Sequence, residues 1–196
     1  MGNIRSVYNA FKYLKAEVDV VENPQKLELE KSLLVIPGVG AFEDGIKNLQ
    51  PFIPKIFEAI DLGVPVLGIC IGFQMFFEES EESKNVKGLG LIKGKVVKIK
   101  TKLKLPHIGW NRLEIVKPNC PIFRGIEDGY VYFAHSYHAI PEDKNVIAAK
   151  TEYGCDVTAA VWKDNLYGVQ FHPEKSGRIG LKILKNFLGL EVNHAL

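Results

Sequence analysis

The sequence contains few cysteines. There are only three, Cys70, Cys120 and Cys155, and they are far apart along the chain. An odd, scattered set predicts no disulfide framework, and no two of them have the Cys-x-x-Cys spacing of a metal site. A chain without a disulfide framework is typical of a reducing compartment, so we expect a cytoplasmic protein. We also expect it to need neither a metal ion nor another cofactor.

Long apolar runs and a strong charge of one sign are also missing. No segment reaches the roughly 20 apolar residues of a membrane helix, and no signal-like pattern precedes the first helix. The formal net charge of +2 is too small to predict binding to nucleic acid or to an anionic membrane. A lysine cluster at residues 93–104 alternates with Val, Ile and Leu, which favours a strand with one solvated face.

What is present is a regular alternation of helical and strand-like segments. Residues 4–14 have the apolar spacing of an amphipathic helix, and residues 17–22 alternate like a strand. Two buried apolar strands are predicted, one in residues 32–42, where it ends in a loop rich in Pro and Gly, and one at residues 65–69. Helical sequence follows each of them, at residues 44–62 and 71–79. This order is typical of parallel βαβ units in a doubly wound sheet.

The second half of the chain changes character. Short strand-like segments joined by turns follow one another from residue 94 to residue 172, and an amphipathic helix begins near Ser176. We therefore predict an α/β fold with one doubly wound mixed sheet and helices on both faces, similar to flavodoxin. The length of 196 residues suits a single domain spanning residues 1–196.

The first candidate for chemistry is Cys70, which follows the apolar strand at residues 65–69 and has Gly68 and Gly72 two positions away. This spacing matches the nucleophile elbow G-x-S-x-G with Cys in place of Ser. A one-residue corner between strand and helix strains the backbone and needs tiny neighbours. The amides at the start of the helix would then favour a reactive thiolate. On this motif alone a structural cysteine is an equally good interpretation.

A thiolate nucleophile needs a base, and His172 is the best candidate. On an extended segment His172 and Glu174 project to the same side, so the carboxylate can orient the imidazole. Pro173 lies between them and places the pair at a strand end. The remaining histidines are weaker candidates because they lie in strand-like sequence or near the C-terminus: His107, His135, His138 and His194.

The third requirement is a pair of donors for a developing oxyanion. The backbone N–H of Ile71 is one candidate by analogy with the elbow, and Gly38 or Val39 in the loop after the preceding strand is the other. That loop alone favours a simple turn. With all three parts present, cysteine-dependent amide hydrolysis or acyl transfer becomes the leading class.

Five segments, in this order, resemble class I (triad) glutamine amidotransferases, and within them the glutaminase subunits of imidazole glycerol phosphate synthase. They are PGVGAF (37–42), GICIGFQMFFEESEE (68–82), LPHIGWN (105–111), YFAHSYH (132–138) and GVQFHPEKS (168–176). The likeness covers almost the whole chain. The Cys and His-Pro-Glu motifs mark the superfamily, and PHIGWN and FFEESEE point to this subunit.

The resemblance implies roles for individual residues. Cys70 would be the nucleophile, His172 the general base and acid, and Glu174 the group that orients His172. The residues implied to bind glutamine are Gly40, Gln74, Glu82, His135, Ser136 and Tyr137. Those implied to face the partner are Asn3, Pro106, Trp110, Tyr132 and Lys175. From the residues alone, Glu82 could equally belong to a solvated acidic face, Gln74 to helix packing and Trp110 to the core.

The implied reaction is hydrolysis of L-glutamine to glutamate and ammonia through a γ-glutamyl thioester. In the family the ammonia passes to a cyclase subunit, a (β/α)8 barrel, which makes imidazole glycerol phosphate and AICAR in histidine biosynthesis. Two other hypotheses stay open. One is a glutaminase serving pyridoxal phosphate, anthranilate or GMP synthesis, and the other is a non-catalytic interaction subunit with the same fold.

The sequence departs from the family at its start. Members open with a buried strand before the first helix, whereas Met1, Gly2 and Asn3 correspond to the end of that strand. We therefore expect the N-terminal strand to be missing. Because a central strand would bury several apolar side chains, we also expect the chain by itself to be poorly stable.

Overall fold

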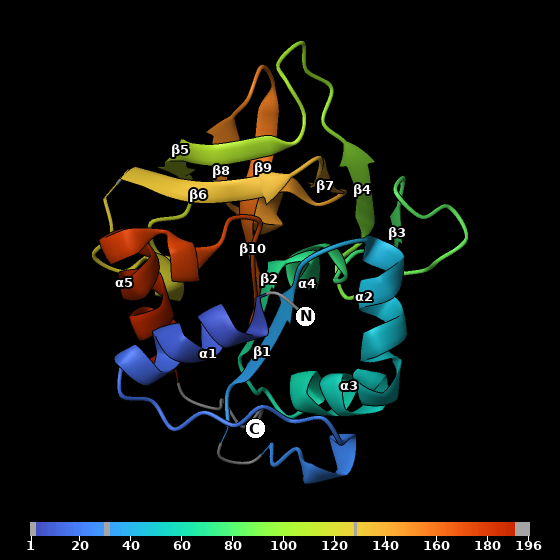
Figure 1. The fold of residues 1–196 in the computed structure, drawn as a ribbon, viewed down its shortest axis with the longest axis vertical. Helices are drawn as coiled ribbons and strands as arrows, with labels where there is room; N and C mark the ends of the chain where they lie inside the picture. The colour runs from blue at the N-terminus through green and yellow to red at the C-terminus, as the bar shows by residue number, and fades with distance from the viewer. Residues whose placement is uncertain (1–2, 30–31, 128, 191–196) are drawn as a thin grey trace.

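A seven-stranded mixed sheet forms the centre of the fold (Figure 1), and the computed structural model describes residues 3–29, 32–127 and 129–190. The strand order is β1-β2-β10-β9-β8-β5-β6. The strands are β1 (Leu34–Gly38), β2 (Val66–Cys70), β5 (His107–Ile115), β6 (Gly129–His135), β8 (Ile147–Glu152), β9 (Asp156–Lys163) and β10 (Leu166–Val169). β1, β2 and β10 pair in parallel and the other neighbours pair antiparallel, which confirms the predicted mixed sheet.

Helices and a small second sheet complete the structure. In Figure 1, α1 and α5 lie on one side of β1 and β2, and α2 and α3 lie on the other. The helices are α1 (Ile4–Tyr13), α2 (Phe42–Leu49), α3 (Ile53–Asp61), α4 (Ile71–Gln74) and α5 (Gly177–Leu188). The second sheet has the order β3-β4-β7, with β3 (Glu79–Ser80), β4 (Gly94–Lys98) and β7 (Tyr137–Pro141). No helix in the described part of the chain is long and apolar enough to cross a bilayer.

The buried centre of the sheet explains the continuous apolar runs in the sequence. All five residues of β2 are buried, because β1 and β10 flank this strand and helices cover it. β10 is likewise buried along its whole length. A strand that is covered on both faces cannot show the alternation of a half-exposed strand. The sequence prediction of a buried strand before Cys70 is therefore confirmed.

Two predicted elements are wrong. Residues 17–22 form no strand, because β1 ends the seven-stranded sheet and no described strand lies beside this segment. The helix predicted for residues 71–79 ends at Gln74. Beyond it, the carbonyl groups of Met75, Phe76 and Phe77 accept hydrogen bonds from Leu89, Ile92 and Gly90, and this pairing stops the helix.

The hairpin of β5 and β6 presents an exposed face. Trp110 pairs with Tyr132 across the two strands, so their side chains lie on the same side. On that side Ile108 is 62% exposed, Trp110 56% and Tyr130 61%. We call the side chains of Ile108, Trp110, Tyr130 and Tyr132 the hairpin face.

Candidate active site

Cys70 occupies a strained corner between β2 and α4. Its φ of 54° and ψ of −107° are unusual for a residue with a side chain. A Cβ atom at Gly68 would lie 2.7 Å from the Phe76 ring and 2.8 Å from the Gly72 carbonyl oxygen. A Cβ atom at Gly72 would overlap the Ile36 carbonyl oxygen of β1. Both glycines flanking Cys70 are thus required by close packing, as the elbow motif predicts.

The parallel strands bring the remaining chemical groups to the same edge of the sheet. Gly38, the last residue of β1, is the register partner of Cys70. Val169 ends β10 beside Ile69, and the chain then continues through Gln170 to His172. The carboxyl ends of parallel strands are where open α/β sheets hold their ligands.

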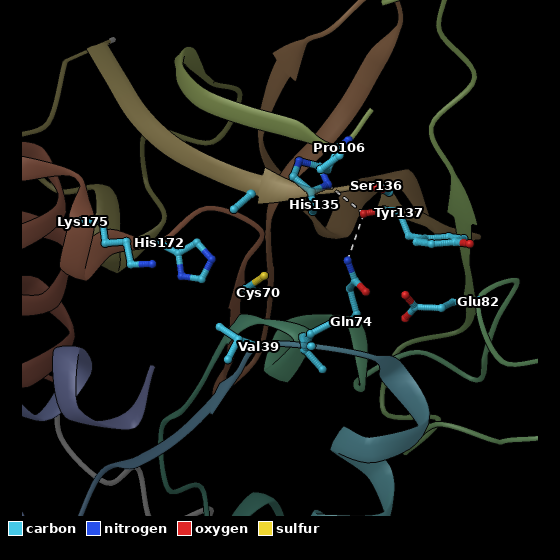
Figure 2. A pocket seen from close by; sticks show the side chains of 13 residues that line it. Val39, Cys70, Gln74, Glu82, Pro106, His135, Ser136, Tyr137, His172 and Lys175 are labelled. Atoms are coloured by element: carbon cyan, nitrogen blue, oxygen red, sulfur yellow. Dashed lines mark hydrogen bonds between the residues drawn. The ribbon is translucent and has the colours of Figure 1, made fainter. Parts of the chain in front are cut away.

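A pocket of about 320 Å³ opens at this edge (Figure 2). It is lined by Val39, Gly40, Cys70, Ile71, Gln74, Glu82, Pro106, Ala134, His135, Ser136, Tyr137, His172 and Lys175. All six residues that the resemblance assigns to glutamine binding lie in this lining. Of the oxyanion candidates, Val39 and Ile71 line the pocket, whereas Gly38 lies behind it and packs against Ile71.

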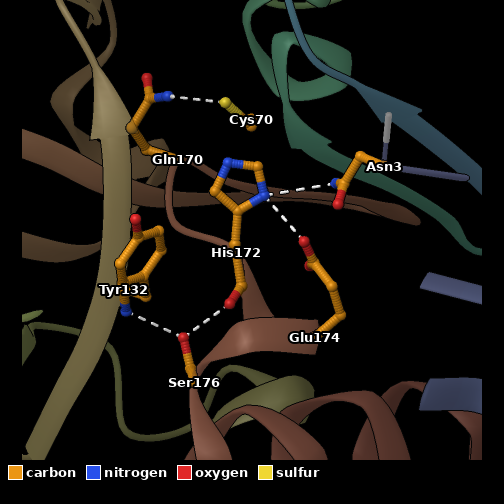
Figure 3. Close-up of polar contacts among 7 residues, drawn as sticks. All are labelled: Asn3, Cys70, Tyr132, Gln170, His172, Glu174 and Ser176. Atoms are coloured by element: carbon orange, nitrogen blue, oxygen red, sulfur yellow. Dashed lines mark hydrogen bonds and ion pairs between the residues drawn. The ribbon is translucent and has the colours of Figure 1, made fainter. Parts of the chain in front are cut away.

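His172 and Glu174 form a buried pair (Figure 3). His172 Nδ1 donates to Glu174 Oε1 at 2.8 Å, and the two side chains are 2% and 0% exposed. The backbone around them is fixed, because Ser176 Oγ donates to the His172 carbonyl at 2.6 Å and His172 N donates to the Tyr132 carbonyl at 2.8 Å. With Nδ1 protonated in this way, Nε2 is the ring nitrogen that remains for proton exchange at the sulfur.

The pKa of His172 is raised to about 9. Burial, the largest single influence, lowers it, but hydrogen bonds and charge interactions with Cys70 and Glu174 together outweigh burial. A histidine that stays protonated near neutral pH beside a cysteine stabilises the thiolate as an ion pair. Such an arrangement can supply a sulfur nucleophile and an acid that gives a proton to a leaving group.

Asn3 lies on the other side of the same imidazole. Its carboxamide is 3.3 Å from His172 Nδ1, and the residue is only 2% exposed. The atom nearest the ring is Asn3 Nδ2, and Asn3 Oδ1 is buried without a hydrogen-bond partner. The resemblance places Asn3 on the docking face, but its side chain is buried beside the His172 ring and cannot reach a partner's surface.

Gln74 lines the pocket, and only the nitrogen of its side-chain amide has hydrogen-bond partners. Its Nε2 donates to the Tyr137 carbonyl and to Gln170 Oε1, both at 2.9 Å, while Oε1 is buried without a partner. Glu82 accepts from Phe42 N at 2.8 Å through Oε2, which holds this carboxylate at the start of α2. An acceptor oxygen and a carboxylate in one pocket suit the amide and ammonium groups of an amino acid.

His135 and His107 connect this wall to β5. His135 Nδ1 donates to the Tyr137 carbonyl at 2.8 Å, and its Nε2 accepts from His107 Nδ1 at 3.2 Å. Asn111 Nδ2 donates to His107 Nε2 at 3.2 Å and to the Glu152 carbonyl at 2.7 Å. The Tyr137 carbonyl can only accept, so His135 Nδ1 carries a proton, and the Nε2 atom of each ring then acts as an acceptor in this series. Burial accordingly lowers the pKa of His107 to about 4 and that of His135 to about 3.

The other residues implied to face a partner lie in two neighbouring places, at the pocket and on the hairpin face. Pro106 and Lys175 are exposed and line the pocket. Trp110 and Tyr132 belong to the hairpin face, with ring centroids 6.2 Å apart, and Lys175 Nζ lies 5.8 Å from the Tyr132 ring. The ring centroid of Tyr132 is in turn 6.4 Å from that of His172, so aromatic contacts lead from the hairpin face to His172.

Sequence reasoning missed several of these residues. Gln170, which contacts Cys70, lies two positions before His172, and the period-two argument used for Glu174 would have found it. The contact between His107 and His135 depends on the register of β5 and β6, which the sequence does not reveal. His194 lies outside the described residues. Within those ranges no group of three His, Cys, Asp or Glu side chains could hold a metal ion.

The buried histidines predict a specific loss of stability in acid. The pKa of His138 is lowered to about 4 by burial, so the unfolded chain binds its proton first and stability falls as the pH drops below 6.5. We expect His138→Gln to reduce the slope of the unfolding free energy between pH 6 and pH 5 by about 1.4 kcal/mol per pH unit. Urea denaturation at several pH values measures this slope.

His172→Gln is the matched control. Because the folded-state pKa of His172 is raised, its contribution is fully present below pH 6.5 and disappears only as the pH rises towards 9. This variant should leave the slope between pH 6 and pH 5 unchanged. An equal reduction in both variants would contradict the assignment.

Comparison with known proteins agrees with this geometry. Residues 1–190 match the family Glutamine amidotransferase class-I. The chain belongs to this family. Solved structures of similar fold include a glutamine amidotransferase with a TM-score of 0.74 and 19% identity, covering 95% of this chain and 93% of the other. A glutamine amidotransferase from Thermotoga maritima has a TM-score of 0.60 and 18% identity, covering 93% and 75%.

Relatives at higher identity carry a more specific name. Imidazole glycerol phosphate synthase subunit HisH of Methanocaldococcus jannaschii is 49% identical over 190 residues, covering 96% of this chain and 95% of that protein. The subunit of the same name from Methanothermobacter thermautotrophicus is 46% identical over 187 residues, covering 95% and 93%. Both alignments extend over nearly the full length of each protein.

Proposed function

We propose that this chain hydrolyses L-glutamine and supplies the ammonia to imidazole glycerol phosphate synthase in histidine biosynthesis. The observation that carries the proposal is the arrangement of Cys70, His172 and buried Glu174 at one end of a pocket. A carboxylate, Glu82, lines the same pocket. Full-length relatives named as HisH subunits of this synthase support the choice of pathway.

The residues have distinct roles in the reaction. Cys70 Sγ attacks the side-chain amide carbon of glutamine, and the backbone N–H groups of Ile71 and Val39 stabilise the oxyanion that forms. His172 gives its proton to the departing nitrogen, so ammonia leaves and a γ-glutamyl thioester remains. His172 then takes a proton from water, which attacks the thioester and releases glutamate. Glu174 holds the imidazole in the orientation that both steps need.

The remaining pocket residues recognise the amino acid. Glu82 binds the α-ammonium, the open Oε1 of Gln74 accepts from an N–H group of the substrate, and the segment from His135 to Tyr137 forms the opposite wall. The backbone at Gly40 is exposed at the pocket mouth and completes the substrate site. Gly38 does not contact substrate in this proposal and serves to pack the loop against α4.

The partner in this proposal is the cyclase subunit, a (β/α)8 barrel. It docks on the hairpin face together with Pro106 and Lys175, next to the pocket from which ammonia leaves. Exposed aromatic residues such as Trp110 are typical anchors of protein interfaces. The whole chain acts as one glutamine amidotransferase domain, and its three free cysteines suit the cytoplasm.

The test is to reconstitute the chain with the cyclase subunit of a related synthase. We expect the two to co-purify, and glutamate release to increase when the cyclase and its nucleotide substrate are added. Trp110→Ala should weaken complex formation by about 30-fold, because truncating a central aromatic anchor costs about 2 kcal/mol. Isothermal titration calorimetry measures this dissociation constant.

Leu62→Ala is the control, since Leu62 is 40% exposed and follows α3, away from β5 and β6 (Figure 1). It should leave binding unchanged. Glutamate release that never appears, even with the cyclase and its substrate present, would rule out the proposed function. Equal weakening in both variants would instead rule out the hairpin face as the docking site.

A further inference from the structure

Gln170 is a buried polar residue beside Cys70, and the proposed reaction gives it no role. Its side chain is 0% exposed, and its Nε2 donates to Cys70 Sγ at 3.8 Å (Figure 3). It lies two residues before His172 on the segment that leaves β10, so one short stretch of chain carries both the imidazole and this amide.

The orientation of this amide is determined by its neighbours. The Tyr137 carbonyl oxygen can only accept, so the Gln74 nitrogen must face it. The second hydrogen of the same nitrogen is donated to Gln170 Oε1 at 2.9 Å. Gln170 therefore turns its own nitrogen towards Cys70, and a rotated amide would lose the bond to Gln74.

A donor at this position matters because the sulfur is buried. Cys70 is 3% exposed, so few water molecules can solvate a thiolate there. A buried anion without hydrogen-bond donors is costly. The Gln170 amide supplies a donor to the sulfur (Figure 3), and the His172 ring lines the same pocket as Cys70.

We propose that Gln170 is a catalytic residue that stabilises the Cys70 thiolate through its amide N–H. Gln74 acts through Gln170 as a positioning residue, and the same Gln74 side chain lines the glutamine pocket. The proposal deepens the proposed function and depends on it, since Cys70 is the nucleophile in both. Filling of the pocket by substrate would then be coupled to the hydrogen bonds of the sulfur.

The test is alkylation of the purified chain by iodoacetamide at pH 7, with each cysteine followed separately by mass spectrometry. The thiolate displaces iodide, so the rate reports how much reactive thiolate is present. Cys155 is half-buried and reports reagent reactivity, whereas Cys120 is buried and becomes labelled only if the chain unfolds. Neither glutamine nor the cyclase is needed, so a failure here is distinct from a failure of the proposed function.

Gln170→Leu should lower the alkylation rate of Cys70 about tenfold, as expected for the loss of one hydrogen bond to an anion. Gln170→Glu keeps the shape but replaces the N–H by an acceptor, so it should lower the rate more than tenfold. Gln74→Met frees the Gln170 amide to rotate and should lower the rate about threefold. Gln25→Glu, at an exposed position, is the matched control and should leave the rate unchanged.

The proposal is overturned if Cys70 in Gln170→Leu reacts within twofold of the wild-type rate while Cys120 stays protected. If Cys120 becomes labelled in Gln170→Leu, that variant has unfolded and Gln170→Glu takes its place. A Cys70 rate within twofold of wild type in Gln170→Glu, with Cys120 protected, then overturns the proposal. If both variants expose Cys120, Gln74→Met decides, and an unchanged Cys70 rate in it overturns the proposal.

Discussion

Replacing Cys70 by alanine should lower glutamine hydrolysis by at least about 10⁴-fold in the complex with the cyclase, the scale typical of losing a catalytic nucleophile. No thioester can form, and His172 then has no sulfur to act with. Because Cys70 has a positive φ, alanine occupies the same strained corner without the sulfur. Cys70→Ala therefore removes the reacting atom while the elbow stays in place.

The measurement is glutamate release under saturating glutamine, together with mass spectrometry after 6-diazo-5-oxonorleucine. We expect one adduct, on Cys70, in the wild-type chain and none in Cys70→Ala. Cys155→Ala is the control, because Cys155 lies before β9 and outside the pocket lining. Its activity should stay within twofold of wild type. More than 1% residual activity in Cys70→Ala would mean that another group attacks the amide.

The second large effect concerns Gly72, whose position next to β1 leaves no room for a side chain. A Cβ atom there would overlap the Ile36 carbonyl oxygen, which belongs to the backbone of a buried strand residue and cannot move aside. We expect Gly72→Ala to destabilise the fold by more than about 4 kcal/mol, the range reserved for severe steric conflicts. Urea denaturation followed by circular dichroism measures the change.

Gly189→Ala is the matched control for this substitution. Gly189 caps α5 with a negative φ of −84°, and a Cβ atom there would lie 3.5 Å from the Asn186 carbonyl oxygen. It should change stability by less than about 1 kcal/mol. A Gly72→Ala protein as stable as this control would show that β1 and α4 can separate, contrary to the packing described above.

The features that could be predicted from the sequence are those set by residues close together along the chain. Gly68 and Gly72 predicted the tight elbow at Cys70, because only a close approach of backbones requires glycine at both positions. The pairing of His172 with Glu174 was also predictable, since period-two spacing on an extended chain is a local property. The mixed sheet followed from the change between continuous and alternating apolar patterns.

The missed features depend on contacts between segments far apart in the sequence. The strand expected at residues 17–22 needs a neighbour, and an alternating pattern cannot show whether one is available. Asn3 reaches His172 across 169 residues, and Gln74 reaches Gln170 across 96. The helix after Cys70 stops at Gln74, and the carbonyl groups of the next three residues find partners at residues 89–92. Such pairings are set by the fold as a whole.

The Tyr137 carbonyl has a consequence for how protons move in this protein. It accepts from Gln74 on one side and from His135 on the other, so it joins the sulfur of Cys70 to Asn111 in one continuous series of hydrogen bonds. A backbone carbonyl has no proton to pass on. The series can transmit a change of position between β5 and the pocket, but it cannot conduct protons. In the proposed reaction, protons move through the imidazole of His172 and with water, and not along this series.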